Sequence, residues 1–153
     1  MSGKSVAGHN RSVSDGLAVP PRLSSLIQAG LWPTVDSAHR QNLCPMAAPE
    51  DIDRLAPGET SIFLHPPPFR TLANEIRNSR RFWDEHGALN EIDPELALVI
   101  GDFGLGSDTA IVLDYRHNPS EPSVLRLAWD HDGTHWVEAA SGFAEFARLL
   151  RLG

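Results

Sequence analysis

Four short segments rich in Val, Ile, Leu and aromatic residues follow one another between residues 96 and 140, and only short loops separate them. They read LALVIG, TAIVLDY, SVLRLAW and THWVEAA, and the links are DFGLGSD, RHNPSEP and DHDG. This composition favours β-strands. Because a parallel pair of strands needs a crossover of about a dozen residues, such short links imply antiparallel pairing. The spacing therefore predicts an antiparallel meander.

Helical patterns flank the predicted meander on both sides. Before it, apolar residues recur at helical spacing in PRLSSLIQAG, APEDIDRLAPG and FRTLANEIRNSRRFWDEHGAL, while TSIFLH reads as a further strand. After it, SGFAEFARLL is typical of a helix that Ser141 caps and that buries Phe143 and Phe146. We expect an α+β fold with N-terminal helices, an antiparallel sheet of about four to five strands, and a C-terminal helix packed on the sheet.

The length of 153 residues indicates one domain with its own hydrophobic core, which we place at residues 20–153. Residues 1–19 are small and polar and lack apolar periodicity, which predicts a disordered tail. The sequence contains no apolar run of the roughly 18 residues that cross a bilayer, and its N-terminus lacks the apolar core of a secretory signal. We therefore expect a cytoplasmic protein.

Negative charge is concentrated in the predicted sheet. The formal net charge is -7, and residues 91–138 alone carry ten acidic side chains against two arginines. Such a surface repels nucleic-acid phosphates and attracts a basic partner. We expect another protein as the partner, with no role for nucleic acid or membrane; solubility alone is the competing explanation of the charge.

The segment VIGDFGLGSD holds Gly101, Gly104 and Gly106 together with two aspartates, and it could form a phosphate cradle, a cation site or a link between two strands. A phosphate-binding loop of the Walker type needs a Lys before Ser or Thr, and Lys4 is the last lysine in the chain. A dinucleotide fingerprint needs the spacing G-x-G-x-x-G before a helix, but a strand pattern follows here. The third interpretation is a link between strands, where glycine supplies positive φ angles. We favour the third.

Metal binding and catalysis have weaker support. Aspartates 102, 108, 130 and 132, with His131 and His135, offer ligands for a metal-assisted hydrolase, but DHDGTH lacks the spacing of a calcium-binding loop and Asp-Gly is first a hairpin signal. Cys44 and Ser107 are the candidate nucleophiles, and neither belongs to a recognisable catalytic motif. We therefore predict no cofactor, no metal and no enzymatic activity, with the hydrolase as an alternative.

The four tryptophans have an interpretation of their own. We expect Trp32, Trp83, Trp129 and Trp136 to anchor the core, and an exposed one would mark an interface.

The second half of the chain resembles the SUKH superfamily, which includes fungal cell-wall-assembly regulators and many bacterial immunity proteins. The shared pattern is an apolar strand that ends in Ile-Gly-Asp, a glycine-containing loop, a strand with Leu-Asp, a strand that ends in Trp, and a closing Ser-x-Phe-x-x-Phe helix. The corresponding residues are Ile100, Gly101, Asp102, Gly104, Gly106, Leu113, Asp114, Trp129, Ser141, Phe143 and Phe146. The match covers roughly residues 92–152, and the first half of the chain departs from the family pattern.

The resemblance implies an α+β binding domain without catalytic residues. In bacterial polymorphic toxin systems such domains neutralise a toxin by binding it, and in fungi they act as signalling scaffolds. We therefore expect an immunity protein whose partner has a basic surface, with a regulatory scaffold as the alternative. The charges expected at the interface are those of Asp102, Asp108, Asp114, Asp130 and Asp132.

Overall fold

Two strands in the middle of the sheet are buried over their whole length. In the computed structural model, which describes residues 13–153, every residue of β5 (Ala97–Asp102) and β6 (Ala110–Asp114) is buried. Val99 contributes to an apolar cluster on one face of the sheet, and its neighbour Ile100 contributes to a second cluster on the other face. The continuous apolar runs in the sequence therefore belong to strands that are covered on both faces.

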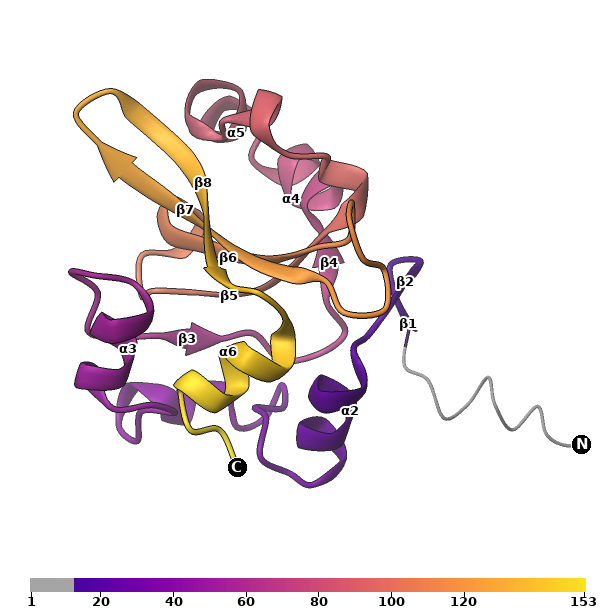
Figure 1. The fold of residues 1–153 in the computed structure, drawn as a ribbon, viewed down its shortest axis with the longest axis vertical. Helices are drawn as coiled ribbons and strands as arrows, with labels where there is room; N and C mark the ends of the chain where they lie inside the picture. The colour runs from indigo at the N-terminus through magenta and orange to yellow at the C-terminus, as the bar shows by residue number, and fades with distance from the viewer. Residues whose placement is uncertain (1–12) are drawn as a thin grey trace, which may run out of the picture.

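The other strands extend this pair into a six-stranded antiparallel sheet (Figure 1). Its order is β3-β5-β6-β7-β8, and β4 pairs with β5 on the same side as β3. The strand bounds, with those of a separate hairpin β1-β2, are β1 Val13–Ser14, β2 Leu17–Ala18, β3 Phe63–Leu64, β4 Arg70–Thr71, β7 Ser123–Asp130 and β8 Gly133–Ala140. The α+β class and the antiparallel meander are confirmed. The extra strand, β4, has two residues and follows a run of prolines, so it carries no alternating pattern.

Helices cover both faces of the sheet. On one face α2 (Pro21–Gln28), α3 (Pro49–Leu55) and α6 (Phe143–Leu149) pack over the larger apolar cluster. On the other face α4 (Leu72–Asn78) and α5 (Arg80–His86) pack over the smaller one (Figure 1). The described residues also form four short 3₁₀ turns, η1 Ala38–Asn42, η2 Leu89–Glu91, η3 Pro94–Leu96 and η4 Gly106–Thr109. Of the helices within residues 13–153, none has the length and apolarity needed to cross a membrane.

The C-terminal helix packs on the sheet as expected, but Ser141 does not cap it. Phe143 and Phe146 are fully buried, which confirms the predicted apolar stripe. Gly142 occupies the N-cap position, and the backbone N–H of Phe143 donates a hydrogen bond of 3.0 Å to Oε1 of Glu121. A carboxylate is favoured at a helix N-terminus. The prediction for Ser141 is therefore wrong because a side chain from the loop before β7 takes that place.

The first described residues form a hairpin instead of a tail. Asp15, in the turn between β1 and β2, accepts hydrogen bonds from the backbone N–H of Thr71 at 2.8 Å and from its hydroxyl at 3.0 Å. These bonds stabilise the charged carboxylate and lower the pKa of Asp15. The prediction of a disordered tail is wrong for residues 13–19, and its remaining part, residues 1–12, lies outside the described residues.

Candidate functional site

The glycines between β5 and β6 serve backbone geometry. Gly104 and Gly106 have φ angles of 98° and 62°, in the region that glycine enters without steric cost. Gly101 has another reason: a Cβ atom there would lie 2.8 Å from the carbonyl oxygen of Phe63, so only glycine allows β3 to approach β5 this closely. Phe103 folds back into the core. These contacts support the interpretation of the segment as a structural link.

Asp102, the last residue of β5, is buried and only 7% exposed. Its Oδ1 accepts a hydrogen bond of 2.7 Å from the backbone N–H of Gly104, and its Oδ2 lies 2.9 Å from Nε2 of His65. Both carboxylate oxygens therefore have partners inside the protein. This burial is incompatible with the expected role of Asp102 at the rim of a partner interface.

Asp114, the last residue of β6, is even more enclosed, with 2% exposure. Its two oxygens pair with Nε and Nη2 of Arg116, each at 2.9 Å. Such a two-point pair gives both carboxylate oxygens a charged partner inside the protein. The expected contact of Asp114 with a partner is therefore contradicted, and both buried aspartates leave the predicted interface.

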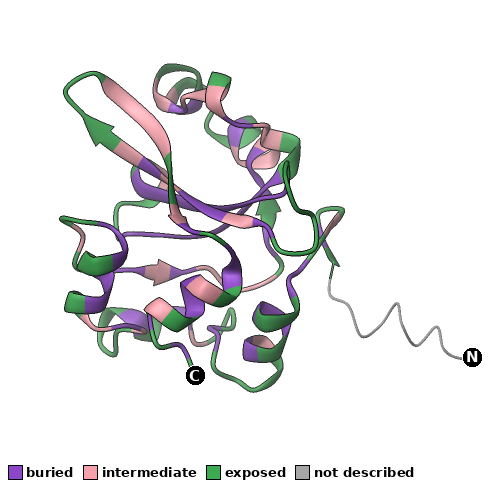
Figure 2. Cartoon of the chain, in the orientation of Figure 1, coloured by how far each residue is buried: buried purple, intermediate pink, exposed green. Residues whose placement is uncertain are grey.

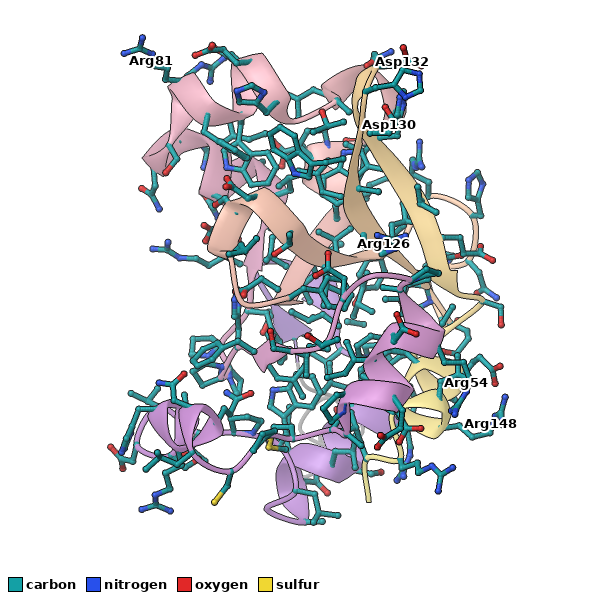
Figure 3. All side chains as sticks on the ribbon, turned by 90° about the vertical axis from the view of Figure 1, so that its left-hand side faces the viewer. Arg54, Arg81, Arg126, Asp130, Asp132 and Arg148 are labelled. Carbon is teal, nitrogen blue, oxygen red and sulfur yellow. The ribbon has the colours of Figure 1, made fainter. Side chains whose placement is uncertain are left out.

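The other three predicted aspartates are exposed and lie near two exposed apolar side chains. Asp108 lines one cleft together with Leu105, which is 67% exposed, and Trp129, which is 48% exposed. Asp130 and Asp132 follow Trp129 at the tip of the β7-β8 hairpin (Figure 3), which extends beyond the body of the sheet (Figure 2). We refer to these five residues as the hairpin surface.

Trp129 is held in a fixed orientation although it is exposed. Its indole N–H donates a hydrogen bond to the backbone carbonyl of Asp108, and its ring centroid lies 5.1 Å from that of His86. Trp32 and Trp83 are buried core residues, as expected. The core assignment is wrong for Trp129, which presents a large apolar surface to solvent. Because its hydrogen bond already orders the side chain, a partner that binds this surface does not have to order it. An exposed and fixed tryptophan is typical of an interaction site.

The cleft beside Trp129 combines apolar and charged groups in a volume of about 430 Å³. Arg126, which Figure 3 labels, is half-buried and lines this cleft. It forms no ion pair or side-chain hydrogen bond with any described residue. Tryptophan and arginine are the side chains that contribute most often to binding energy at protein interfaces. The remaining lining residues are Pro57, Glu59, Leu105, Asp108, Thr109, Leu127 and Ala128.

The outer part of the hairpin is tied to the segment that follows α5. Nδ1 of His135 lies 2.9 Å from Oε2 of Glu91, and Oε1 of Glu91 accepts a hydrogen bond from the backbone N–H of Trp136. The indole N–H of Trp136 donates to the carbonyl of Gly87 at 2.8 Å. The hydrogen bond between Glu91 and His135 lowers the pKa of Glu91 and raises the pKa of His135. These contacts position the hairpin tip.

The proposed cation ligands are only partly brought together. Asp130, His131 and Asp132 place ligand atoms within 4.8 Å of one another, and all three are exposed. Oδ1 of Asp130 accepts the backbone N–H of Asp132 at 2.8 Å, the hydrogen bond of an ordinary Asx turn. The carboxylates of Asp102 and Asp108 line two different clefts. This geometry favours a hairpin turn over the metal-assisted hydrolase.

The two candidate nucleophiles lie apart from any acid–base pair that the structure describes. Cys44 is exposed and lines a small cleft beside Trp32 and Met46. In the part of the chain from residue 13 onward, no hydrogen bond joins Cys44 or Ser107 to an imidazole. The absence of enzymatic activity stays a prediction.

No protein-family model, curated protein or solved structure matches this chain. The resemblance to the SUKH superfamily therefore stays a prediction. Sequence patterns also left Leu105 and Arg126 out of the candidate site. An exposed Leu in a glycine loop and a lone Arg on a strand gave no signal, because only the folded loop places them in one cleft with Trp129.

Proposed function

We propose that this chain is a non-catalytic protein-binding domain, a SUKH-type immunity protein that neutralises a toxin by binding it. The observation that carries the proposal is the hairpin surface, where a fixed, exposed Trp129 and an exposed Leu105 stand among three exposed carboxylates. An apolar and aromatic centre with a charged rim is the usual anatomy of a protein interface.

The negative charge at the rim of the hairpin surface favours a basic partner. Asp108, Asp130 and Asp132 are all acidic, and the chain carries a net charge of -7. A basic toxin domain, such as one that acts on nucleic acid, presents the complementary charge, and opposite charges accelerate the encounter of two proteins. Trp129 and Arg126 then supply short-range contacts in the cleft.

The order of elements also supports the proposal. A buried strand that ends in Gly101 and Asp102, a glycine loop, the strands β6 and β7 and a closing helix come in the order of the SUKH pattern, and β8 stands between β7 and that helix. Binding of a toxin and binding within a regulatory scaffold use the same kind of surface, so the partner itself separates these two functions.

The test is affinity capture from the native organism with two variants that change the net charge by the same amount. In the first variant, Asp130→Lys and Asp132→Lys reverse the hairpin tip. In the control, Asp36→Lys and Glu50→Lys make the same change in charge at exposed positions that are part of no ion pair between described residues. We expect the wild type and the control to retain one basic protein that the tip variant loses.

The captured protein then decides the function. A toxin whose activity is blocked by the wild-type chain supports the immunity function, and the tip variant should associate with it about tenfold more slowly at low salt. A captured protein without toxic activity supports the scaffold. Equal capture by all three chains refutes the assignment of the hairpin surface.

A further inference from the structure

Strand β8 lies at the end of the sheet opposite β3, and among the described strands it pairs with β7 alone (Figure 1). It is eight residues long, and its middle is open to solvent: Val137 is 39% exposed, and Glu138 is exposed as well. The unpaired N–H and C=O groups of an edge strand form a template for another strand. The outer edge of β8 is long enough and open enough to receive one.

The backbone of β8 alternates between groups that face β7 and groups that face outward. The N–H of Trp136 donates a hydrogen bond of 2.9 Å to Oε1 of Glu91, which lies outside the sheet, so this residue faces outward. The register from Gly133 to Glu138 contains no bulge, and Glu138, two residues further, therefore faces outward too. Neither backbone group of Glu138, nor the C=O of Trp136, forms a hydrogen bond with another residue in the 13–153 range. We refer to these three successive groups, an acceptor, a donor and an acceptor, as the β8 edge.

The protein itself covers the other half of this strand. In addition to the bond from Trp136 to Glu91, the indole N–H of Trp136 donates to the carbonyl of Gly87 at 2.8 Å, and the hydroxyl of Thr134 donates to the carbonyl of His86 at 2.6 Å. The segment from the end of α5 to η2 thus lies along residues 134–136. The β8 edge begins where this cover ends, so an added strand reaches it without displacing these bonds.

The side chains beside the β8 edge determine what kind of strand it accepts. Glu138 is exposed and belongs to no ion pair between described residues. Glu121, which lies against Gly142 just beyond the end of the strand, is likewise exposed and without an ion pair in the described part of the chain. Opposite charges that face each other across two strands stabilise the pair, and like charges destabilise it. A basic residue opposite Glu138 is therefore favoured, whereas a second copy of this chain, paired through the same groups, would place one Glu138 against the other.

We propose that the β8 edge binds an extended segment of a partner polypeptide, in which a Lys or Arg between two apolar residues lies opposite Glu138. The segment pairs with the C=O of Trp136 and with both backbone groups of Glu138, and one of its apolar side chains packs beside Val137 on the other face of the strand. Addition of a strand to an exposed sheet edge is a common mode of peptide recognition. The proposal goes beyond the hairpin surface, since its occupant is an extended segment rather than a folded face, and it does not depend on the proposed function.

The first test follows the amide signals of the full chain by NMR while a capped peptide, Thr-Val-Lys-Val-Thr, is added to about 1 mM. We expect the amide signal of Glu138 to shift and its hydrogen exchange to slow, because the peptide bonds this N–H. The amide of Trp136, which Glu91 already bonds, should change less. A peptide with N-methyl groups on its three central residues keeps the charge but lacks the donors, and it should bind at least about tenfold more weakly.

Two matched variants test the role of the side chain at position 138. Glu138→Lys and Glu95→Lys make the same change in charge, and Glu95 is an exposed residue outside the β8 edge that belongs to no ion pair between described residues. We expect the first to weaken binding of the lysine peptide about tenfold and the second to leave it unchanged. The peptide Thr-Val-Glu-Val-Thr should show the reverse preference and bind the Glu138→Lys chain about tenfold more tightly than the wild type.

Three outcomes would overturn the proposal. The first is the absence of any shift at residue 138, or equal binding of the N-methylated peptide. The second is an equal effect of the two variants, which would show that the peptide binds by charge alone. The third is a shift of the same signal when the chain is concentrated without peptide, which would assign the edge to a second copy.

Discussion

The substitution Gly106→Ala tests directly whether the glycine loop is shaped by its backbone. A Cβ atom at this position meets no other atom within 4 Å, so the change introduces no clash, and the φ angle of 62° alone determines its cost. An L-residue in the left-handed region loses about 1–2 kcal/mol. Replacing Gly by Ala also lowers the conformational entropy of the unfolded chain, which offsets about 0.4–1 kcal/mol of this cost. The free energy of unfolding should therefore fall by about 1 kcal/mol.

Urea denaturation measures this difference. With a slope of about 2 kcal/mol/M, the midpoint should fall by about 0.5 M while the slope stays constant. Gly106→Asn is the control, because Asn adopts the left-handed conformation more readily and should cost less than Ala. Gly104→Ala should cost more, since its Cβ would also lie 2.9 Å from Oγ of Ser61. A Gly106→Ala protein that is as stable as the wild type would refute the backbone interpretation.

Three further predictions concern other parts of the molecule. Glu121→Ala should lower the free energy of unfolding by about 1 kcal/mol because it removes the helix cap, whereas Ser141→Ala should change it by less than about 0.5 kcal/mol in the same urea assay. Because the pKa of His135 is raised, its protonated side chain stabilises the docked hairpin fully below pH 6.5, and this stabilisation is lost as the pH rises through the raised pKa. Because the pKa of Glu91 is lowered, the stabilisation from its carboxylate is present above pH 4.5 and is lost as the pH falls through the lowered pKa. Hydrogen exchange at the amide of residue 136, corrected for intrinsic rates, should be slowest between about pH 4.5 and pH 6.5. Glu91→Gln should remove the change on the acid side and weaken the change on the alkaline side, where Asp130 and Asp132 still raise the pKa of His135. Trp129→Ala should weaken partner binding at least about 30-fold, or about 2 kcal/mol, in a calorimetric titration, with little effect on stability.

The arrangement of the sheet follows from local sequence patterns. The apolar runs of β5 and β6 reflect burial on both faces, and the short links fix the antiparallel order. The tail prediction failed at residues 13–19 because Asp15 is anchored by Thr71, a residue far away along the chain. Local polarity cannot reveal such a long-range hydrogen bond.

The candidate site was predicted less completely than the fold. The acidic character of the second half is visible in composition, but burial separates Asp102 and Asp114 from the three exposed aspartates. Asp102, Asp114 and the exposed Asp130 each end a strand and look alike in sequence. The partners His65 and Arg116 become evident only in the folded chain. The exposed state of Trp129 likewise depends on how far the β7-β8 hairpin extends beyond the sheet (Figure 2).

Hydrogen exchange measured by mass spectrometry on the captured complex tests the central claim most directly. If the hairpin surface binds the partner, exchange should slow in residues 127–135 and in the loop 104–109 when the complex forms. Slowed exchange confined to other segments, with these two unchanged, would contradict the assignment of the interface.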